Sequence, residues 1–160
     1  GPDADNVGVT NTSVGSPGGG SPSVASPDVV PGPIAHSDQG PKRRVRALRG
    51  ATTVDEDTTE QVTQRTQALL AAMVARNGVD HADVISVLFT ATDDVHSMFP
   101  ATAARAAGFG DVPLLCAREL DINGAQPRCI RVMMHLETSN EELHHIYLEG
   151  ARGLRDDLPE

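Results

Sequence analysis

Cysteine is scarce in this chain of 160 residues, which contains only Cys116 and Cys129. Two cysteines cannot make a disulfide framework, and neither belongs to a CxxC or Cys/His spacing that would indicate a metal site. The neighbours His144 and His145 are adjacent on a predicted helix, so their imidazoles diverge and do not form a metal pair. We therefore expect two reduced, buried thiols and no bound metal.

Long apolar runs and an excess of positive charge are also lacking. No stretch reaches the length of a membrane span, and the first residues lack the charged-then-apolar layout of a secretory signal. The formal net charge of -9 argues against nucleic acid as a partner, because a phosphate backbone requires a broad basic face. We expect a soluble, cytoplasmic protein without membrane or nucleic-acid partners, in which any bound anion is small and locally gripped.

Leucine, methionine and aromatic residues are missing from residues 1–44, which consist largely of Gly, Pro, Ser, Asp and Val. Such a segment cannot build a core, and its composition is typical of a flexible linker. Gly1-Pro2 looks like the remnant of a protease cleavage site. We expect a disordered tail over residues 1–44 and one folded domain over residues 45–160.

The pattern of apolar residues predicts an α+β or α/β domain in the order β-α-β-α-β-β-α, with a mixed sheet packed against helices. A capping-box spacing at Asp57-Thr58-Thr59-Glu60 opens the first helix, and a second such spacing at Ser139-Asn140-Glu141-Glu142 predicts a last helix ending at Gly150. The third and fourth strands are candidates for a hairpin through Asn123-Gly124. The expected strands cover residues 45–51, 84–90, 112–119 and 129–138, and the expected helices cover residues 57–77, 100–108 and 139–150.

One arginine, Arg131, lies inside the strand predicted from Cys129 to Thr138. Apolar residues alternate on both faces of this strand, which is typical of a central strand covered on each side. A guanidinium there needs an anion or a polar cavity, since it does not deprotonate. From this stretch alone, an internal pair with a carboxylate and an anion-binding role are both open.

Lysine is absent from residues 45–160, which contain ten arginines. A genome rich in G and C could explain the exposed ones. Arg49, Arg105 and Arg131 lie at or within apolar elements, where an unpaired charge is costly. Since guanidinium groups bind carboxylates in a two-pronged geometry, three such arginines suggest a dicarboxylate ligand. No phosphate-binding loop and no Ser-His-Asp arrangement is evident from spacing.

Five blocks in this order resemble the AroH class of chorismate mutase, from Val45 to about Leu158. The blocks are Arg49-Gly50-Ala51-Thr52-Thr53-Val54, Ser97-Met98-Phe99-Pro100-Ala101, Val112-Pro113 with Cys116 and Glu119, Cys129-Ile130-Arg131-Val132-Met133-Met134, and Ile146-Tyr147-Leu148-Glu149 with Leu154-Arg155.

The resemblance implies a homotrimer with the mixed sheets forming a pseudo-α/β barrel and an active site in each cleft between subunits. It implies conversion of chorismate to prephenate by an intramolecular [3,3] rearrangement, a shikimate-pathway step of aromatic amino acid biosynthesis. No cofactor is expected, because the reaction needs neither a nucleophile nor a general base.

The resemblance also implies roles for single residues. Arg131, Glu119 and Arg49 are expected to be catalytic, with Arg131 donating to the ether oxygen. Arg49 and Tyr147 should bind the side-chain carboxylate, while Glu119 and the region of Cys116 should hold the ring hydroxyl and orient Arg131. Arg105 should face the ring carboxylate, and Phe99, Ala101 and Leu114 should form apolar walls. Phe99, Ala101 and Arg105 are expected to come from the neighbouring subunit. Leu154 and Arg155 should close the C-terminal side of the site.

Two departures from the family pattern affect the ring end of the site. Thr102 stands where the family commonly has a lysine, and Leu115 replaces a smaller polar residue. The grip on the ring carboxylate is therefore expected to be weaker.

Alternatives remain open from the residues themselves. Cys116 can be a core thiol, Tyr147 a packing residue on a helix face, and Glu119 a neutralising partner of an arginine. A trimeric imine or enamine deaminase of related fold would explain Arg131 but not Arg49 and Tyr147 together. A non-catalytic module that binds small anions, with a tail recruiting a partner, is the other alternative.

Overall fold

The computed structural model describes residues 15, 19, 20, 32, 40–155 and 157. The chain divides into two units, Gly1–Asp38 and Gln39–Glu160. Nearly all of the first unit lies outside the described residues, so the disorder predicted for residues 1–44 stays a prediction. The folded unit includes Arg44 in its first strand, one residue before the predicted boundary.

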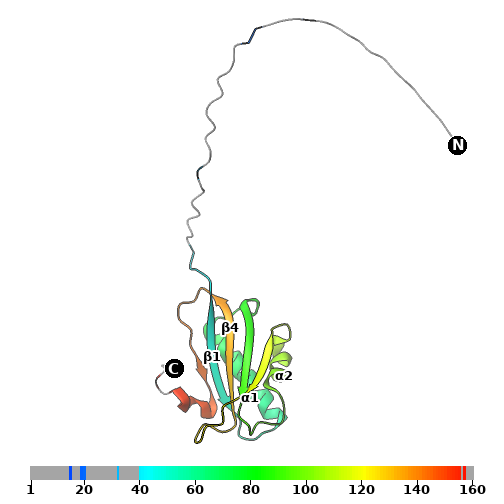
Figure 1. Cartoon of the computed structure of the whole chain (residues 1–160), viewed down its shortest axis with the longest axis vertical. Helices are drawn as coiled ribbons and strands as arrows, with labels where there is room; N and C mark the ends of the chain where they lie inside the picture. The colour runs from blue at the N-terminus through cyan, green and yellow to red at the C-terminus, as the bar shows by residue number, and fades with distance from the viewer. Residues whose placement is uncertain (1–14, 16–18, 21–31, 33–39, 156, 158–160) are drawn as a thin grey trace, which may run out of the picture. The chain divides into compact units, whose positions relative to one another are not determined.

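A mixed five-stranded sheet with the strand order β3-β2-β4-β1-β5 forms the centre of the folded unit (Figure 1). This arrangement confirms the predicted α+β class. The strands are β1 Arg44–Thr53, β2 Val84–Ala91, β3 Leu114–Arg118, β4 Cys129–Thr138 and β5 Ile146–Tyr147. The helices are α1 Thr59–Asn77 and α2 Pro100–Ala104, with 3₁₀ turns at His81–Asp83 and Glu149–Arg155 and a π-helical turn at Arg105–Phe109.

The predicted hairpin between the third and fourth strands is wrong. β3 pairs in parallel with β2, whereas β4 pairs antiparallel with both β2 and β1. β3 is short and has mostly exposed or partly buried side chains, which suits an edge. β4 is longer and buries six of its ten residues, which suits the central position.

The N-cap of the first helix is one residue later than predicted. Thr58 is the N-cap, and its hydroxyl accepts a hydrogen bond from the backbone N–H of Gln61. The Asp57 carboxylate instead accepts from the backbone N–H groups of His96 and Ser97, at 2.8 and 3.0 Å. Asp57 therefore fixes the loop before α2 rather than capping α1.

The helix predicted from Ser139 to Gly150 is also wrong, because this segment runs as a loop into β5 and a 3₁₀ turn. The buried Asn77 side chain accepts from the His144 backbone N–H at 2.6 Å and donates to the His144 carbonyl at 2.9 Å. Ile146 then pairs with Gly50 of β1. These hydrogen bonds to distant residues replace backbone hydrogen bonds that a helix would have formed.

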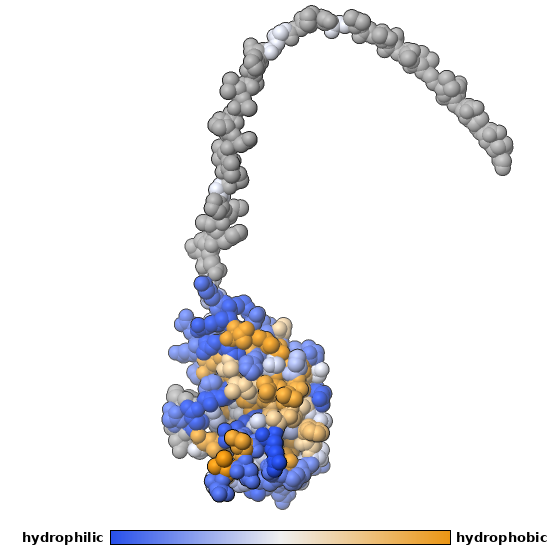
Figure 2. Space-filling view, in the orientation of Figure 1, coloured by the Kyte–Doolittle hydropathy of each residue, from blue (hydrophilic) through white to orange (hydrophobic). Residues whose placement is uncertain are grey.

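The helices α1 and α2 cover one face of the sheet. The core between that face and the helices includes Leu48, Phe89 and Met134 of the sheet and Leu69 and Met73 of α1. In Figure 1 the helices lie behind the sheet, so Figure 2 looks onto the other side.

We call that other side the open face and define it by Val45, Arg49, Leu88, Leu115, Arg131 and Met133. Figure 2 shows apolar side chains gathered over it. Within the described part of a single chain, the cover predicted for both faces of β4 is therefore present on one face only. No helix of the described residues is long and apolar enough to cross a membrane.

Candidate active site

Arg131 is on β4, in a row of residues that crosses the whole sheet. Its neighbours in register are Ala51 of β1 and Thr90 of β2, and Ala51 in turn pairs with Tyr147 of β5. All of these residues lie on the open face. The Arg131 side chain is 48% exposed. The prediction of a buried arginine is therefore wrong for the described part of a single chain, because α1 and α2 pack on the other face of the sheet.

Glu119 connects Arg131 to Thr90 immediately after β3. Its Oε2 atom accepts a hydrogen bond from the Thr90 hydroxyl at 2.6 Å and lies 3.2 Å from Arg131 Nε. Its Oε1 atom accepts, from the residues that the structure describes, only a long bond of 3.3 Å from the Leu120 backbone N–H. The backbone N–H of Glu119 donates to the Ala91 carbonyl, which holds the residue against β2. The internal ion pair considered from the sequence is thus present, and it leaves about half of the Arg131 side chain exposed.

Arg49 and Tyr147 lie on the same open face, at the β1–β5 side. Arg49 precedes Ala51 by two residues, and Ala51 pairs with Tyr147. Tyr147 was predicted to lie on a helix and is instead in β5.

Arg155 follows in the last 3₁₀ turn and forms a two-pronged ion pair with Asp157 at 2.8 and 2.9 Å. The hydrogen bonds that Arg155 donates lower the pKa of Asp157 to about 2, and Arg49 makes a smaller contribution. The pair with Asp157, and to a smaller extent Tyr147, raises the pKa of Arg155. The segment after β5 thus places cationic and anionic groups beside Arg49, with Leu154 partly buried next to them.

His145 is a neighbour of Arg49 that sequence reasoning did not assign to the site. Its Nδ1 atom accepts a hydrogen bond from the Arg49 backbone N–H at 3.0 Å. Burial lowers the pKa of His145, and Arg49, Arg155 and Arg46 lower it further. The imidazole is therefore held neutral with Nδ1 unprotonated. No spacing motif indicates this contact, since the two residues are far apart in the sequence.

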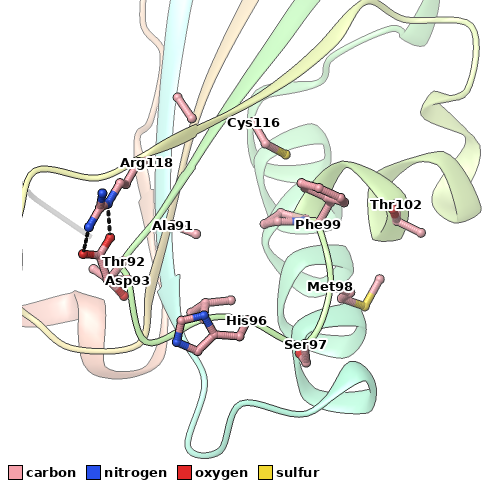
Figure 3. Close-up of a pocket in the computed structure, with 13 residues that line it drawn as sticks. Ala91, Thr92, Asp93, His96, Ser97, Met98, Phe99, Thr102, Cys116 and Arg118 are labelled. Carbon is pink, nitrogen blue, oxygen red and sulfur yellow. Dashed lines mark hydrogen bonds and ion pairs between the residues drawn. The ribbon is translucent and has the colours of Figure 1, made fainter.

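A second group of candidate residues surrounds α2 and β3. Phe99, Thr102 and Cys116 line a pocket of about 840 Å³, into which the exposed Phe99 ring projects (Figure 3). An ion pair between Arg118 and Asp93 lies at the edge of this pocket.

The other members of this group have different exposures. Ala101 is buried, Leu114 is partly buried, Arg105 is exposed beyond α2, and Leu115 lies on the open face with 59% exposure. Cys129 is buried as predicted, whereas Cys116 is only partly buried. Burial raises the pKa of the Cys129 thiol.

The structure thus sorts the predicted site residues into two groups. Arg49, Glu119, Arg131, Tyr147 and Arg155 belong to the open face and the segment beside it. None of these five lines the pocket of Phe99, Thr102 and Cys116. Among the described residues, no three His, Cys, Asp or Glu side chains are grouped so as to hold a metal ion.

Residues 45–158 match the family profile described as chorismate mutase type I. The chain belongs to this family. It is 42% identical over 117 residues to the chorismate mutase AroH of Bacillus subtilis (strain 168), an alignment that covers 71% of this chain and 92% of that protein. It is 45% identical over 117 residues to the chorismate mutase AroH of Thermus thermophilus, covering 71% and 96% of the two chains.

A solved structure supports the fold as well as the family. The chorismate mutase from Clostridium thermocellum matches with a TM-score of 0.66 and 43% identity, covering 68% of this chain and 98% of that one. The resemblance inferred from the sequence blocks is therefore confirmed. The chain is a chorismate mutase, an isomerase of aromatic amino acid biosynthesis.

Proposed function

We propose that this chorismate mutase converts chorismate to prephenate in active sites formed between copies of the chain. The observation that carries the proposal is the row of Tyr147, Arg131 and Thr90, with Glu119, on the sheet face opposite α1 and α2. Tyr147, Arg131 and Glu119 do not line the pocket of Phe99, Thr102 and Cys116. A single chain therefore offers two halves of a site, and a second copy can complete each.

The first task of the site is to hold a flexible dianion in the compact conformer in which the two reacting ends meet. Arg49 and Tyr147 are proposed to bind the side-chain carboxylate, with Leu154 and Arg155 closing that end. Arg155 already pairs with a carboxylate, that of Asp157. A substrate carboxylate can take up the same two-pronged geometry.

The second task is to stabilise the negative charge that grows on the ether oxygen as the C–O bond stretches. Arg131 is proposed to donate to this oxygen. The two flanking strands fix the backbone of Arg131, and Glu119 engages its Nε, so the guanidinium is aimed before the reaction starts. A preorganised donor of this kind costs no reorganisation in the transition state.

The neighbouring copy is proposed to supply the ring end of the site. Phe99 and Ala101 of that copy would form apolar walls together with Leu114, and its Arg105 would face the ring carboxylate. Glu119 and the region of Cys116 would accept the ring hydroxyl. Thr102 and Leu115 lie at this end, where they weaken the grip on the ring carboxylate because neither carries a positive charge.

The open face supports assembly into a homotrimer. Its apolar members include Val45, Leu88, Leu115 and Met133, and Leu115 and Val45 are each 59% exposed. An apolar sheet face of this kind is typical of a surface that is covered by another protein. The proposed occupant is a second copy of the chain, since burial of this face also brings Arg49 and Arg131 to an interface. A cytoplasmic location stays a prediction from the sequence.

Turnover of chorismate tests the proposal directly. The purified chain is incubated with chorismate, prephenate is followed by NMR, and the mass of the assembly is measured by light scattering. We expect turnover well above the spontaneous rate from a species three times the mass of the chain. A trimer that does not accelerate the reaction would contradict the proposed activity, and an active monomer would contradict the shared site.

A further inference from the structure

Thr90 is a polar residue in the row that holds Arg131, and neither the motifs nor the predicted site included it. It lies on β2, directly beside Arg131 of β4, and its side chain is partly buried. Its hydroxyl donates to Glu119 Oε2 at 2.6 Å, a length typical of an O–H group bonded to an ionised carboxylate. This is the shortest hydrogen bond that Glu119 makes among the described residues.

We propose that Thr90 is a positioning residue of the reaction, which fixes the Glu119 carboxylate so that Oε2 faces the protein and Oε1 faces the substrate. The proposal rests on the proposed function, in which Glu119 accepts the substrate's ring hydroxyl. It adds the group that orients Glu119 and names the oxygen that remains available.

Counting acceptor positions on the carboxylate leads to this assignment. Each carboxylate oxygen can accept about two hydrogen bonds. Oε2 accepts the Thr90 hydroxyl at 2.6 Å and lies in an ion pair 3.2 Å from Arg131 Nε, so the protein already engages this oxygen. Among the described residues, Oε1 accepts only the Leu120 backbone N–H, at 3.3 Å. A donor on the substrate therefore finds its strongest free acceptor at Oε1.

Threonine suits this task because its side chain has few rotamers in a strand. Branching at Cβ restricts χ1, so the hydroxyl direction follows from the backbone of β2. That backbone is paired on both sides, with β3 and β4. The same oxygen, Oε2, contacts both Thr90 and Arg131. By holding this carboxylate, Thr90 therefore also helps to orient the Arg131 guanidinium. Loss of the hydroxyl should affect turnover as well as substrate binding.

Replacement of Thr90 by valine tests the proposal, because valine has the same shape without the donor. We expect Thr90→Val to lower kcat/KM for chorismate by about 10- to 100-fold, as for a lost hydrogen bond to a charged group. Thr90→Ser keeps the hydroxyl and should retain activity within about threefold, since only a methyl group is removed. The matched control is Thr52→Val, since the buried Thr52 hydroxyl has no hydrogen-bond partner among the described residues. That control should keep wild-type kcat/KM.

A double-mutant cycle separates positioning from a general structural role. Thr90→Val is introduced into a Glu119→Gln background, where the ionised carboxylate is absent, and should there change kcat/KM by less than about threefold. Equal losses in both backgrounds would show that Thr90 acts independently of Glu119, and wild-type activity of Thr90→Val would show that it does not act at all. Either result overturns the proposal and leaves the proposed function intact.

A crystal structure of Thr90→Val provides a test that does not depend on turnover. We expect Glu119 to move, so that the distance from Oε2 to Arg131 Nε exceeds the ion-pair limit of about 4 Å. A carboxylate that stays in its place without the hydroxyl would overturn the positioning role even if the wild-type chain proved inactive towards chorismate. Failure of the wild-type chain to turn over chorismate would instead count against the proposed function.

Discussion

At the scale of single residues, the central feature of the site is the Arg131 guanidinium and its partners. Its position in an apolar strand indicated a charge that needs a partner, and Glu119 is that partner within the chain. The pair uses the inner Nε atom, and the side chain is half exposed on the open face. A guanidinium has five N–H donors, so the pair with Glu119 does not use its full donor capacity. The remaining donors suit a carboxylate and an ether oxygen at the same time.

Arg131→Lys keeps the charge and removes the planar fork. We expect kcat to fall by about 10²- to 10³-fold, as when one preorganised donor to a developing oxyanion is lost, since an ammonium group cannot reproduce two fixed directions. Steady-state kinetics measures the loss, while circular dichroism and light scattering check that the fold and assembly are unchanged. Near-normal turnover would return Arg131 to a purely structural ion pair.

At the scale of elements, the contact between β1 and α1 determines where Arg49 lies. Gly50 faces the helix, and a Cβ atom there would approach Met73 Sδ to 2.6 Å and Leu69 Cδ1 to 3.0 Å. The missing side chain lets the helix pack closely on the strand that carries Arg49. The loop before β5 supports the same strand from its edge, through the hydrogen bond from Arg49 to His145.

Gly50→Ala should destabilise the fold by about 1 to 3 kcal/mol, because the added methyl group forces Met73 and Leu69 to shift in a packed core. Urea denaturation measures the free energy of unfolding. The matched control is Gly110→Ala, where nothing lies within 4 Å of the added Cβ and the backbone is already helical. That variant should be neutral or more stable by about 0.4 to 1 kcal/mol, as for a glycine at an unstrained position. Equal effects at the two sites would show that close packing at Gly50 is unimportant.

The hydrogen bond from Arg49 to His145 predicts that stability falls with acid in a defined window. The pKa of His145 in the folded chain is lowered from 6.5, so the unfolded chain takes up a proton first as the pH falls. The free energy of unfolding should therefore decrease as the pH drops below about 6.5, and the loss should stop below the folded pKa.

Urea denaturation at pH 7.5 and 5.5 measures this dependence, which His145→Gln should reduce. The exposed His96 provides the control, and His96→Gln should keep the wild-type slope. The carboxyl groups with lowered pKa values, such as those of Asp57 and Asp93, titrate below this window. An unchanged slope in His145→Gln would show that His145 does not carry the effect.

At the scale of the whole molecule, the open face is the side of the sheet that α1 and α2 leave uncovered. Leu88 and Met133 pair in register near its centre, with Arg49 and Leu115 on either side. A mixture of apolar and guanidinium groups is exposed there together. Contact with further copies would remove the apolar part from water and would bring the arginines to a cleft.

Leu88→Glu should prevent assembly, because a carboxylate would be buried in an apolar interface without a partner. We expect a monomer by light scattering, with little change in the circular dichroism spectrum, and loss of chorismate turnover by at least tenfold. Gln64→Glu introduces the same charge at an exposed position of α1 and should leave both assembly and turnover unchanged. A trimeric, active Leu88→Glu variant would show that the open face is not the interface.

Much of this architecture follows from local patterns in the sequence. The strand Cys129–Thr138 has both of its predicted bounds, and the first helix ends at Asn77 as predicted. These bounds can be predicted because alternation, periodicity and glycine stops act over neighbouring residues. The five blocks between Arg49 and Arg155 together indicated the family, since the order of blocks is itself a property of the sequence.

Tertiary structure decided what depends on distant partners. The third strand pairs with the second rather than forming a hairpin with the fourth, and the segment 139–147 joins the sheet because Asn77 and Gly50 offer it hydrogen bonds. Thr90 and His145 have no local signature. The pairing of β2 with β3 and β4 places Thr90 beside Glu119, and the loop before β5 places His145 beside Arg49. The exposure of Arg131 likewise depends on which sheet face the helices cover. Side-chain type and local periodicity depend on adjacent residues, whereas strand register and the covering of a sheet face depend on contacts across the whole fold.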